Sequence, residues 1–284
     1  LYGIKYYKSN NKSIQGPGSD GSDADFKFYN SEFPAYQNQS SYTYPNLNLA
    51  LFSENILYLN KQLSITPGIR YEQIKTVSDG SYKFVLLDGA GNAITDTTYQ
   101  NYTKNEREFL LLGLGLSYIT KKDLELYANI SQNYRSVTFA DLSIVNPAYI
   151  VNPNIEDEKG YTSDIGFRGN IKNRISYDIN AFQILYEKRI GFVPKVQDDG
   201  NVKSEKGNIG DAKITGIESL IDINIFNIVP SDFKLNYFVN CAIIKSEYFD
   251  SQQNGIIGNS VESVPKTNIK TGLYLSYKKI KINA

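Results

Sequence analysis

The chain has 284 residues and no net formal charge, since 30 Lys and Arg balance 30 Asp and Glu. A neutral chain lacks the basic footprint of nucleic-acid-binding proteins, so we expect no nucleic-acid partner. The chain has no His, which excludes a Ser-His-Asp triad and a His-ligated metal site, and its one cysteine excludes an internal disulfide framework. We therefore expect a protein that is not an enzyme, with no catalytic residues, no metal site and no resident cofactor.

Apolar and polar residues alternate along one segment after another. In the segment 108–119, for example, Leu110, Leu112, Leu114 and Leu116 share one face, and the residues between them include Gly113. A helix would space its apolar residues 3.6 apart, so a period of two predicts strands with one apolar and one polar face. Ten strands are predicted, at 1–7, 47–59, 62–76, 108–119, 124–134, 159–169, 174–187, 209–225, 232–246 and 264–278.

The connections between these strands alternate strictly between short and long. The short ones are 60–61, 120–123, 170–173 and 226–231, and the long ones are 8–46, 77–107, 135–158, 188–208 and 247–263. An outer-membrane barrel shows this rhythm, because tight turns face the periplasm and long loops face the outside. Strands of ten or more residues also suit a tilted crossing of the hydrocarbon layer, whereas ordinary strands have about five or six residues.

The predicted fold class is therefore all-β, a transmembrane antiparallel β-barrel surrounded by outer-membrane lipid. Hydrocarbon offers no hydrogen bonds, so a sheet can cross it only as a closed barrel. Residues 1–284 are expected to form part of one barrel domain, because ten strands are fewer than the family described next uses. Arg70 and Glu72 fall on the inner face, and we interpret such inner charges as a structural polar network.

Three phrases resemble the TonB-dependent outer-membrane receptors. Residues 152–169, NPNIEDEKGYTSDIGFRG, resemble that family's acidic P-x-L-x-x-E phrase followed by a strand. Residues 181–190, AFQILYEKRI, are similar to its F-x-x-x-Y-x-x-R-I, and residues 208–218, NIGDAKITGIE, resemble its N-x-G-x-A-x-x-x-G-x-E. Residues 127–139 and 18–26 most resemble the ferric citrate receptor branch.

The resemblance implies an active transporter in the outer membrane of a Gram-negative bacterium. It implies a barrel of 22 strands, a plug domain outside this chain that contacts TonB, and a ferric chelate such as ferric citrate or another siderophore as transported ligand. Accessory outer-membrane or lipoprotein partners are compatible with it. The alternatives are a receptor of the same fold for a glycan, a peptide or cobalamin, and a soluble all-β binding module.

An anionic chelate requires cations, and the planar fork of arginine binds carboxylates through two hydrogen bonds. Arg135 is expected at the outer end of a strand on the inner face, Arg189 at the start of a long loop, and Arg107 just outside a strand. We predict that these three arginines bind the ligand, with Gln132 and Tyr134 as neighbours. The simpler interpretation is that each arginine is a solvated loop charge or part of an inner ion pair.

Overall fold

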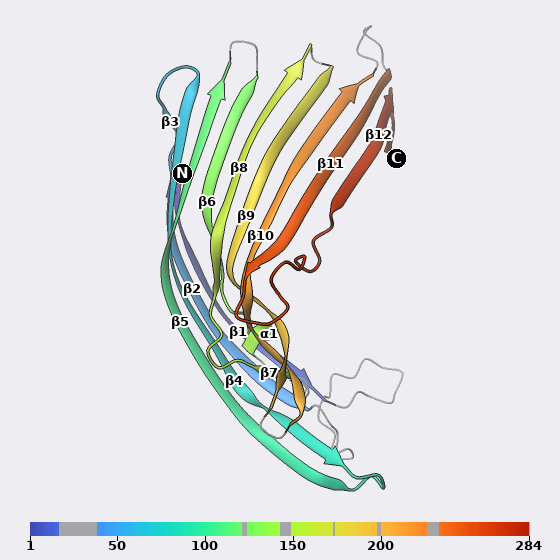
Figure 1. Ribbon diagram of the computed structural model, residues 1–284. Helices are drawn as coiled ribbons and strands as arrows, with labels where there is room; N and C mark the ends of the chain where they lie inside the picture. The colour runs from blue at the N-terminus through green and yellow to red at the C-terminus, as the bar shows by residue number, and fades with distance from the viewer. Residues whose placement is uncertain are drawn as a thin grey trace.

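The computed structural model describes residues 1–16, 39–120, 124–142, 149–172, 174–197, 200–225 and 233–283. They form one curved antiparallel sheet whose neighbours follow the order β1-β2-β4-β5-β6-β8-β9-β10-β11-β12-β13 (Figure 1). Two short strands lie off this path, because β3 pairs with β4 and β7 pairs in parallel with β10. The predicted all-β transmembrane barrel fold, present as part of a larger barrel, is confirmed.

The elements are β1 Tyr2–Gln15, β2 Ser40–Glu54, β3 Leu57–Tyr58, β4 Leu63–Leu87, β5 Ala93–Ile119, β6 Glu125–Arg135, α1 Phe139–Leu142, β7 Tyr149–Val151, β8 Glu158–Ile171, β9 Ile175–Val196, β10 Val202–Asn224, β11 Phe233–Asp250, β12 Thr267–Tyr277 and β13 Ile280–Asn283. Each of the ten predicted strands lies largely within one of these. The sheet is open, because β1 and β13 each pair on one side only within the described residues.

The convex face of the sheet carries the apolar residues. Along β5, Leu112 is 50% exposed and Leu114 is 43% exposed, although both lie in the middle of a regular ladder. Their cross-strand partners share this exposure, since Ile69 and Ile130 are 48% and 50% exposed. No second sheet covers this face within the described residues. An ordered band of uncovered leucine and isoleucine is what a lipid-facing barrel wall requires.

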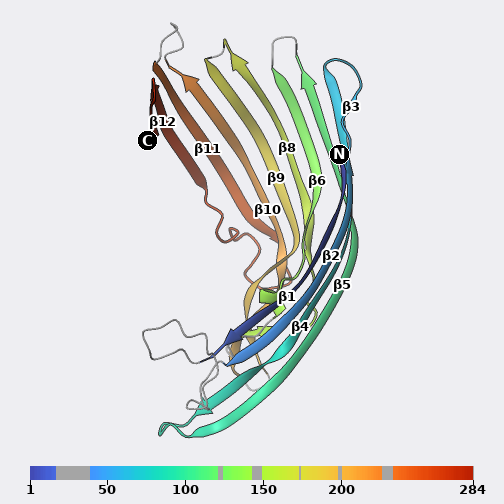
Figure 2. The same cartoon turned by 180° about the vertical axis from the view of Figure 1, so that it is seen from behind.

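Two connections predicted as loops are instead long continuations of strands. The segment 77–107 is mostly β4 and β5, which stay paired as far as Leu87 and Ala93, and 188–208 is mostly β9 and β10. The prediction was wrong because it relied on the apolar period, which disappears where a strand leaves lipid and both faces are wet. The extended hairpins lie at the long-connection end of the sheet, opposite the short turns (Figures 1 and 2).

The described parts of two other long connections, 135–158 and 247–263, lie on the concave side. The one-turn helix α1 lies within the curve of the sheet (Figure 1), where the Phe139 ring packs 4.6 Å from that of Tyr44 on β2. Val137, Leu142 and Ile190 form a small buried cluster around it. The β11–β12 connection packs through Val261 onto a second cluster on β9, β10 and β11. We call the long-connection end of the sheet the outer mouth. The helix α1 and the β11–β12 connection lie on its inner side.

β9 has no bulge near Ala181 and Phe182, because the ladders on both sides run through these residues without a register shift. Phe182 is an inward-facing ring that packs against the cluster around Val193. Residues 18–26, which resemble the ferric citrate branch, lie outside the described residues. No helix in the described ranges is long and apolar enough to cross a membrane.

Candidate functional site

The outer mouth gathers four of the five predicted ligand residues, and a bend in the β9–β10 hairpin shapes it. The ladder shifts register between Asn208, Gly210 and Ala212, opposite Lys188, which adopts a positive φ of 57°. The Lys188 amide donates to Asp211 Oδ1 at 2.8 Å, and Asn208 Nδ2 donates to the Lys188 carbonyl at 2.6 Å. Between Ala212 and Gly210 the ladder gains one residue in β9, and between Gly210 and Asn208 it gains one in β10, so both strands change face there.

Gly210 is required at this bulge. Its φ is 153°, and a Cβ there would lie 2.4 Å from the Asp250 carbonyl oxygen. The backbones of β10 and β11 could not approach so closely around a larger residue. The glycine of the phrase at 208–218 therefore has a steric reason in this chain.

Arg189 follows the bulge, and the inserted residue brings it onto the inner face. Its guanidinium lies over the Tyr186 ring, 5.5 Å from the centroid, and its Nε donates to the Tyr248 hydroxyl at 3.1 Å. Glu262, from the β11–β12 connection, accepts from Arg189 Nε and Nη2 at 3.4 Å each. The sequence placed Arg189 in a loop, whereas it lies inside β9.

Arg135 lies at the end of β6 on the inner face, as predicted, opposite Glu158 in the ladder. Its Nη1 donates to Glu158 Oε1 at 2.9 Å, and its Nη2 donates to Asp141 Oδ2 at 3.1 Å. Glu158 also accepts from the Ile190 amide at 2.8 Å, which ties the end of β6 to the residue after Arg189. Arg135 therefore joins α1, β8 and β9.

Asp141 is the centre of this group, and its side chain is only 2% exposed. Lys206 Nζ lies 2.7 Å from Oδ1, and the amide and hydroxyl of Thr138 each donate to Oδ2 at 2.7 Å. Burial alone would raise the pKa of Asp141, but hydrogen bonds from Lys206 and Thr138 and the charge of Arg135 outweigh it and lower the pKa. A charged carboxylate is thus stable in a buried place.

Arg107 and Tyr134 meet on one carboxylate, that of Asp157. Arg107 Nε lies 2.5 Å from Asp157 Oδ2, Tyr134 donates to the same oxygen, and the Val137 amide donates to Oδ1 at 2.7 Å. The Tyr134 ring stacks on Phe109 with centroids 3.7 Å apart. The Arg107 side chain is only 10% exposed, so its guanidinium is held in place by Asp157. Arg107 lies inside β5, and not outside a strand as predicted.

Gln132 lies apart from the other predicted residues. It has the same strand parity as Ile130 and Leu126, which are exposed on the convex face. Its Oε1 accepts from the Leu112 amide at 2.9 Å, where β5 and β6 stop pairing. Its position is the edge of the lipid-facing wall, and ligand binding by these five residues stays a prediction.

Sequence reasoning missed several residues of the mouth. Lys206 contacts both the Phe192 ring and Asp141, and Tyr42 and Tyr44 stack with centroids 5.9 Å apart on the inner face of β2. The two tyrosines lie in the connection 8–46, which was predicted as a loop, so strand parity did not indicate them. Lys206 lies in the predicted loop 188–208, where no parity could be assigned.

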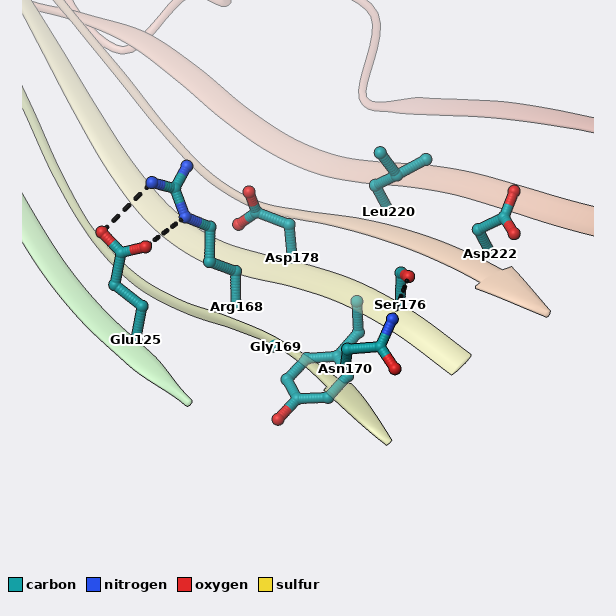
Figure 3. A pocket seen from close by; sticks show the side chains of 9 residues that line it. Glu125, Arg168, Gly169, Asn170, Ser176, Asp178, Leu220 and Asp222 are labelled. Atoms are coloured by element: carbon teal, nitrogen blue, oxygen red, sulfur yellow. Dashed lines mark hydrogen bonds and ion pairs between the residues drawn. The ribbon is translucent and has the colours of Figure 1, made fainter. Parts of the chain in front are cut away.

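A second polar hollow lies on the inner face near the short turns, with a volume of about 400 Å³ (Figure 3). Arg168 donates to both oxygens of Glu125, at 2.8 and 3.1 Å, and Asp178 lies on its other side, accepting from the Tyr127 hydroxyl at 2.6 Å. The inner charges form the polar network expected from the sequence. Within the described ranges, no group of three or more His, Cys, Asp or Glu side chains could hold a metal ion.

The comparisons with known proteins agree on one architecture. The family described as TonB dependent receptor-like, beta-barrel matches residues 1–282. No curated protein matches the sequence. Among solved structures, the ferric-catecholate import receptor Fiu from E. coli K12 is similar with a TM-score of 0.66 at 13% identity, over 99% of this chain and 40% of that one.

Two further structures show how broad the likeness is. The ferric citrate transporter FecA has a TM-score of 0.54 at 17% identity, over 86% of this chain and 42% of that one. The RagAB peptide transporter has a TM-score of 0.51 at 12% identity, over 100% of this chain and 44% of that one. The chain thus spans less than half the length of each, and at such identities the likeness concerns the fold.

Proposed function

Because this chain belongs to the TonB-dependent receptor β-barrel family of the Gram-negative outer membrane, we propose that it is part of an active importer of a ferric chelate. Ferric citrate or another siderophore would be the cargo, and TonB would supply the force through a plug domain outside this chain. The family predicted from the three sequence phrases is established. The ferric citrate branch stays a prediction.

The observation that supports an anionic cargo is the set of cations at the inner side of the outer mouth. Arg135, Arg189 and Lys206 lie on elements that converge around α1 and the β9–β10 hairpin. The Arg135 side chain is 44% exposed, and its guanidinium has more N–H groups than its contacts to Glu158 and Asp141 use. A guanidinium there can bind a carboxylate of the chelate through two hydrogen bonds.

The geometry divides the predicted residues into two groups. Arg135 and Arg189 reach the interior, and we assign to them direct contact with the chelate. Arg107 and Tyr134 are held by Asp157, and Gln132 lies on the convex side. We assign to these three the support of the wall, because releasing a nearly buried Arg107 from its carboxylate would leave an unpaired charge.

The experiment is uptake of radiolabelled ferric citrate by cells whose only receptor for it is the full-length protein. Arg135→Gln and Arg189→Gln should each weaken chelate binding about tenfold or more, because each removes charge-assisted hydrogen bonds. Arg168→Gln, at the short-turn end, is the control and should bind normally if it folds. Uptake of a peptide or glycan without any uptake of ferric chelates would overturn the proposal.

A further inference from the structure

The β11–β12 connection, residues 251–266, forms a strap across the inner face of the sheet. Val261 is 2% exposed and packs with Tyr248, Val193 and Ile209. Backbone bonds hold the strap to β11, including the Tyr248 amide to the Asn259 carbonyl at 2.9 Å. The strap is therefore an ordered element with its own apolar anchor, and it lies directly beside Arg189.

One carboxylate of the strap occupies Arg189. Glu262 accepts from the Tyr248 hydroxyl at 2.7 Å and from two nitrogens of Arg189 at 3.4 Å. Its side chain is 55% exposed, whereas that of Arg189 is only 20% exposed. The contact to Arg189 is long and more than half of the Glu262 side chain is exposed, so breaking the Arg189 contact costs little.

Asp141 offers the opposite case on Arg135. It is buried and receives short hydrogen bonds from Lys206 and from the amide and hydroxyl of Thr138. Displacing it would expose a cluster of unpaired groups in a buried place, which is costly. Of the two arginines that face the interior, Arg135 is held by the fixed carboxylate of Asp141, and Arg189 is held by the exchangeable carboxylate of Glu262.

We infer that Glu262 is an internal substitute for the cargo, and that a carboxylate of an anionic chelate replaces it on Arg189. This inference rests on the proposed function. A chelate carboxylate can take the two-pronged, shorter geometry that Glu262 does not reach, and Glu262 can turn to water while Val261 stays packed. Exchange therefore loosens the strap at Glu262 each time an anionic chelate binds.

The two carboxylates predict opposite effects on affinity. Glu262→Gln removes the competing charge and should tighten binding of ferric citrate about threefold to fivefold, the effect of an exposed ion pair. Asp141→Asn should weaken binding, because Arg135 loses the group that positions it. Glu247→Gln is the matched control. Glu247 comes directly before Tyr248 on β11, so its side chain lies on the opposite face of the sheet, where it pairs with Lys213 and Lys245.

The test is titration of the full-length receptor, in detergent, with ferric citrate and with a neutral ferric hydroxamate. Tighter binding of ferric citrate by both Glu262→Gln and Glu262→Ala, with no change for the neutral chelate, supports the inference. The gain should vanish in an Arg189→Gln background. Unchanged or weaker ferric citrate binding by the Glu262 variants overturns the role of Glu262 alone. A wild-type receptor that binds no ferric chelate overturns the proposed function as well.

Discussion

A charge placed on either face of β6 provides a direct test of the lipid-facing wall. Ile130 and Ser131 are consecutive, so their side chains point to opposite faces of the sheet. Ile130 pairs with Leu114 on the convex face, and Ser131 pairs with Gly113 on the concave one. We therefore compare Ile130→Arg with Ser131→Arg, two substitutions at nearly the same height.

The height of these residues sets the magnitude. Ile130 lies five positions after Glu125, the first residue of β6. With a rise of about 3.3 Å per residue and a tilt of about 40°, this places it ~13 Å from the short-turn end, near the middle of an apolar band about 25 Å tall. An arginine on the lipid face at that depth costs about 2–4 kcal/mol. At about 1.4 kcal/mol per factor of ten, the folded-to-unfolded ratio should fall ~30-fold to ~700-fold.

Ser131→Arg should change stability by no more than about 0.5 kcal/mol, because its side chain enters a polar interior. The assay is denaturant unfolding of the full-length receptor in lipid vesicles, with the folded fraction read from gel mobility. Equal losses for the two variants, or a larger loss for Ser131→Arg, would refute the assignment of the convex face to lipid.

Two further predictions concern the outer mouth and the sheet. Because the pKa of Asp141 is lowered on folding, its charge stabilises the α1 segment above the ordinary pKa of an aspartate, and that contribution is lost as pH falls through the lowered folded value. Hydrogen exchange of residues 136–142, corrected for the intrinsic rate, should thus stay slow near neutral pH and accelerate below about pH 4, and Asp141→Asn should abolish this dependence; equal pH profiles would contradict it. Gly160→Ala should destabilise by about 1–3 kcal/mol, since its Cβ would lie 1.8 Å from the Leu185 carbonyl oxygen, whereas the nearest atom to a Cβ at Gly113 is 3.6 Å away, and Gly113→Ala should unfold like the wild type in the same denaturant assay.

The part of the fold inside the membrane is predictable because lipid enforces a single rule on every strand. Leu112 and Leu114 must face outward, and the residues between them cannot, so the face of each residue follows from its parity. Cys241 shows that the rule extends to small residues, since it pairs with Ile269, one of the exposed residues of the convex face. Outside the membrane the rule no longer applies. Thr97 and Asn101 lie within a regular ladder, yet the polar character of this segment predicted a loop.

The candidate site was harder to predict for two physical reasons. The face of Arg189 depends on the bulge at Lys188, and a lysine in a sequence does not indicate a positive φ. The carboxylate that pairs with Arg189 comes from a connection distant in sequence, since Glu262 lies 73 residues after Arg189. Parity correctly predicted that Arg135 faces inward, but it could not show that the buried Asp141 accepts a hydrogen bond from it.

The position of the arginines along the strands also explains why the mouth can hold charge. Arg135 lies ten positions after Glu125, which corresponds to a height of ~25 Å, the full height of the apolar band. The Glu158 carboxylate links it to the Ile190 amide, so Arg189 lies at a similar level. Cations at this level escape the hydrocarbon and yet face inward at the entrance of the barrel. A carboxylate that approaches from the long-connection end would therefore meet them before the polar network near the short turns, and among the described residues Glu262 is the carboxylate that pairs with Arg189.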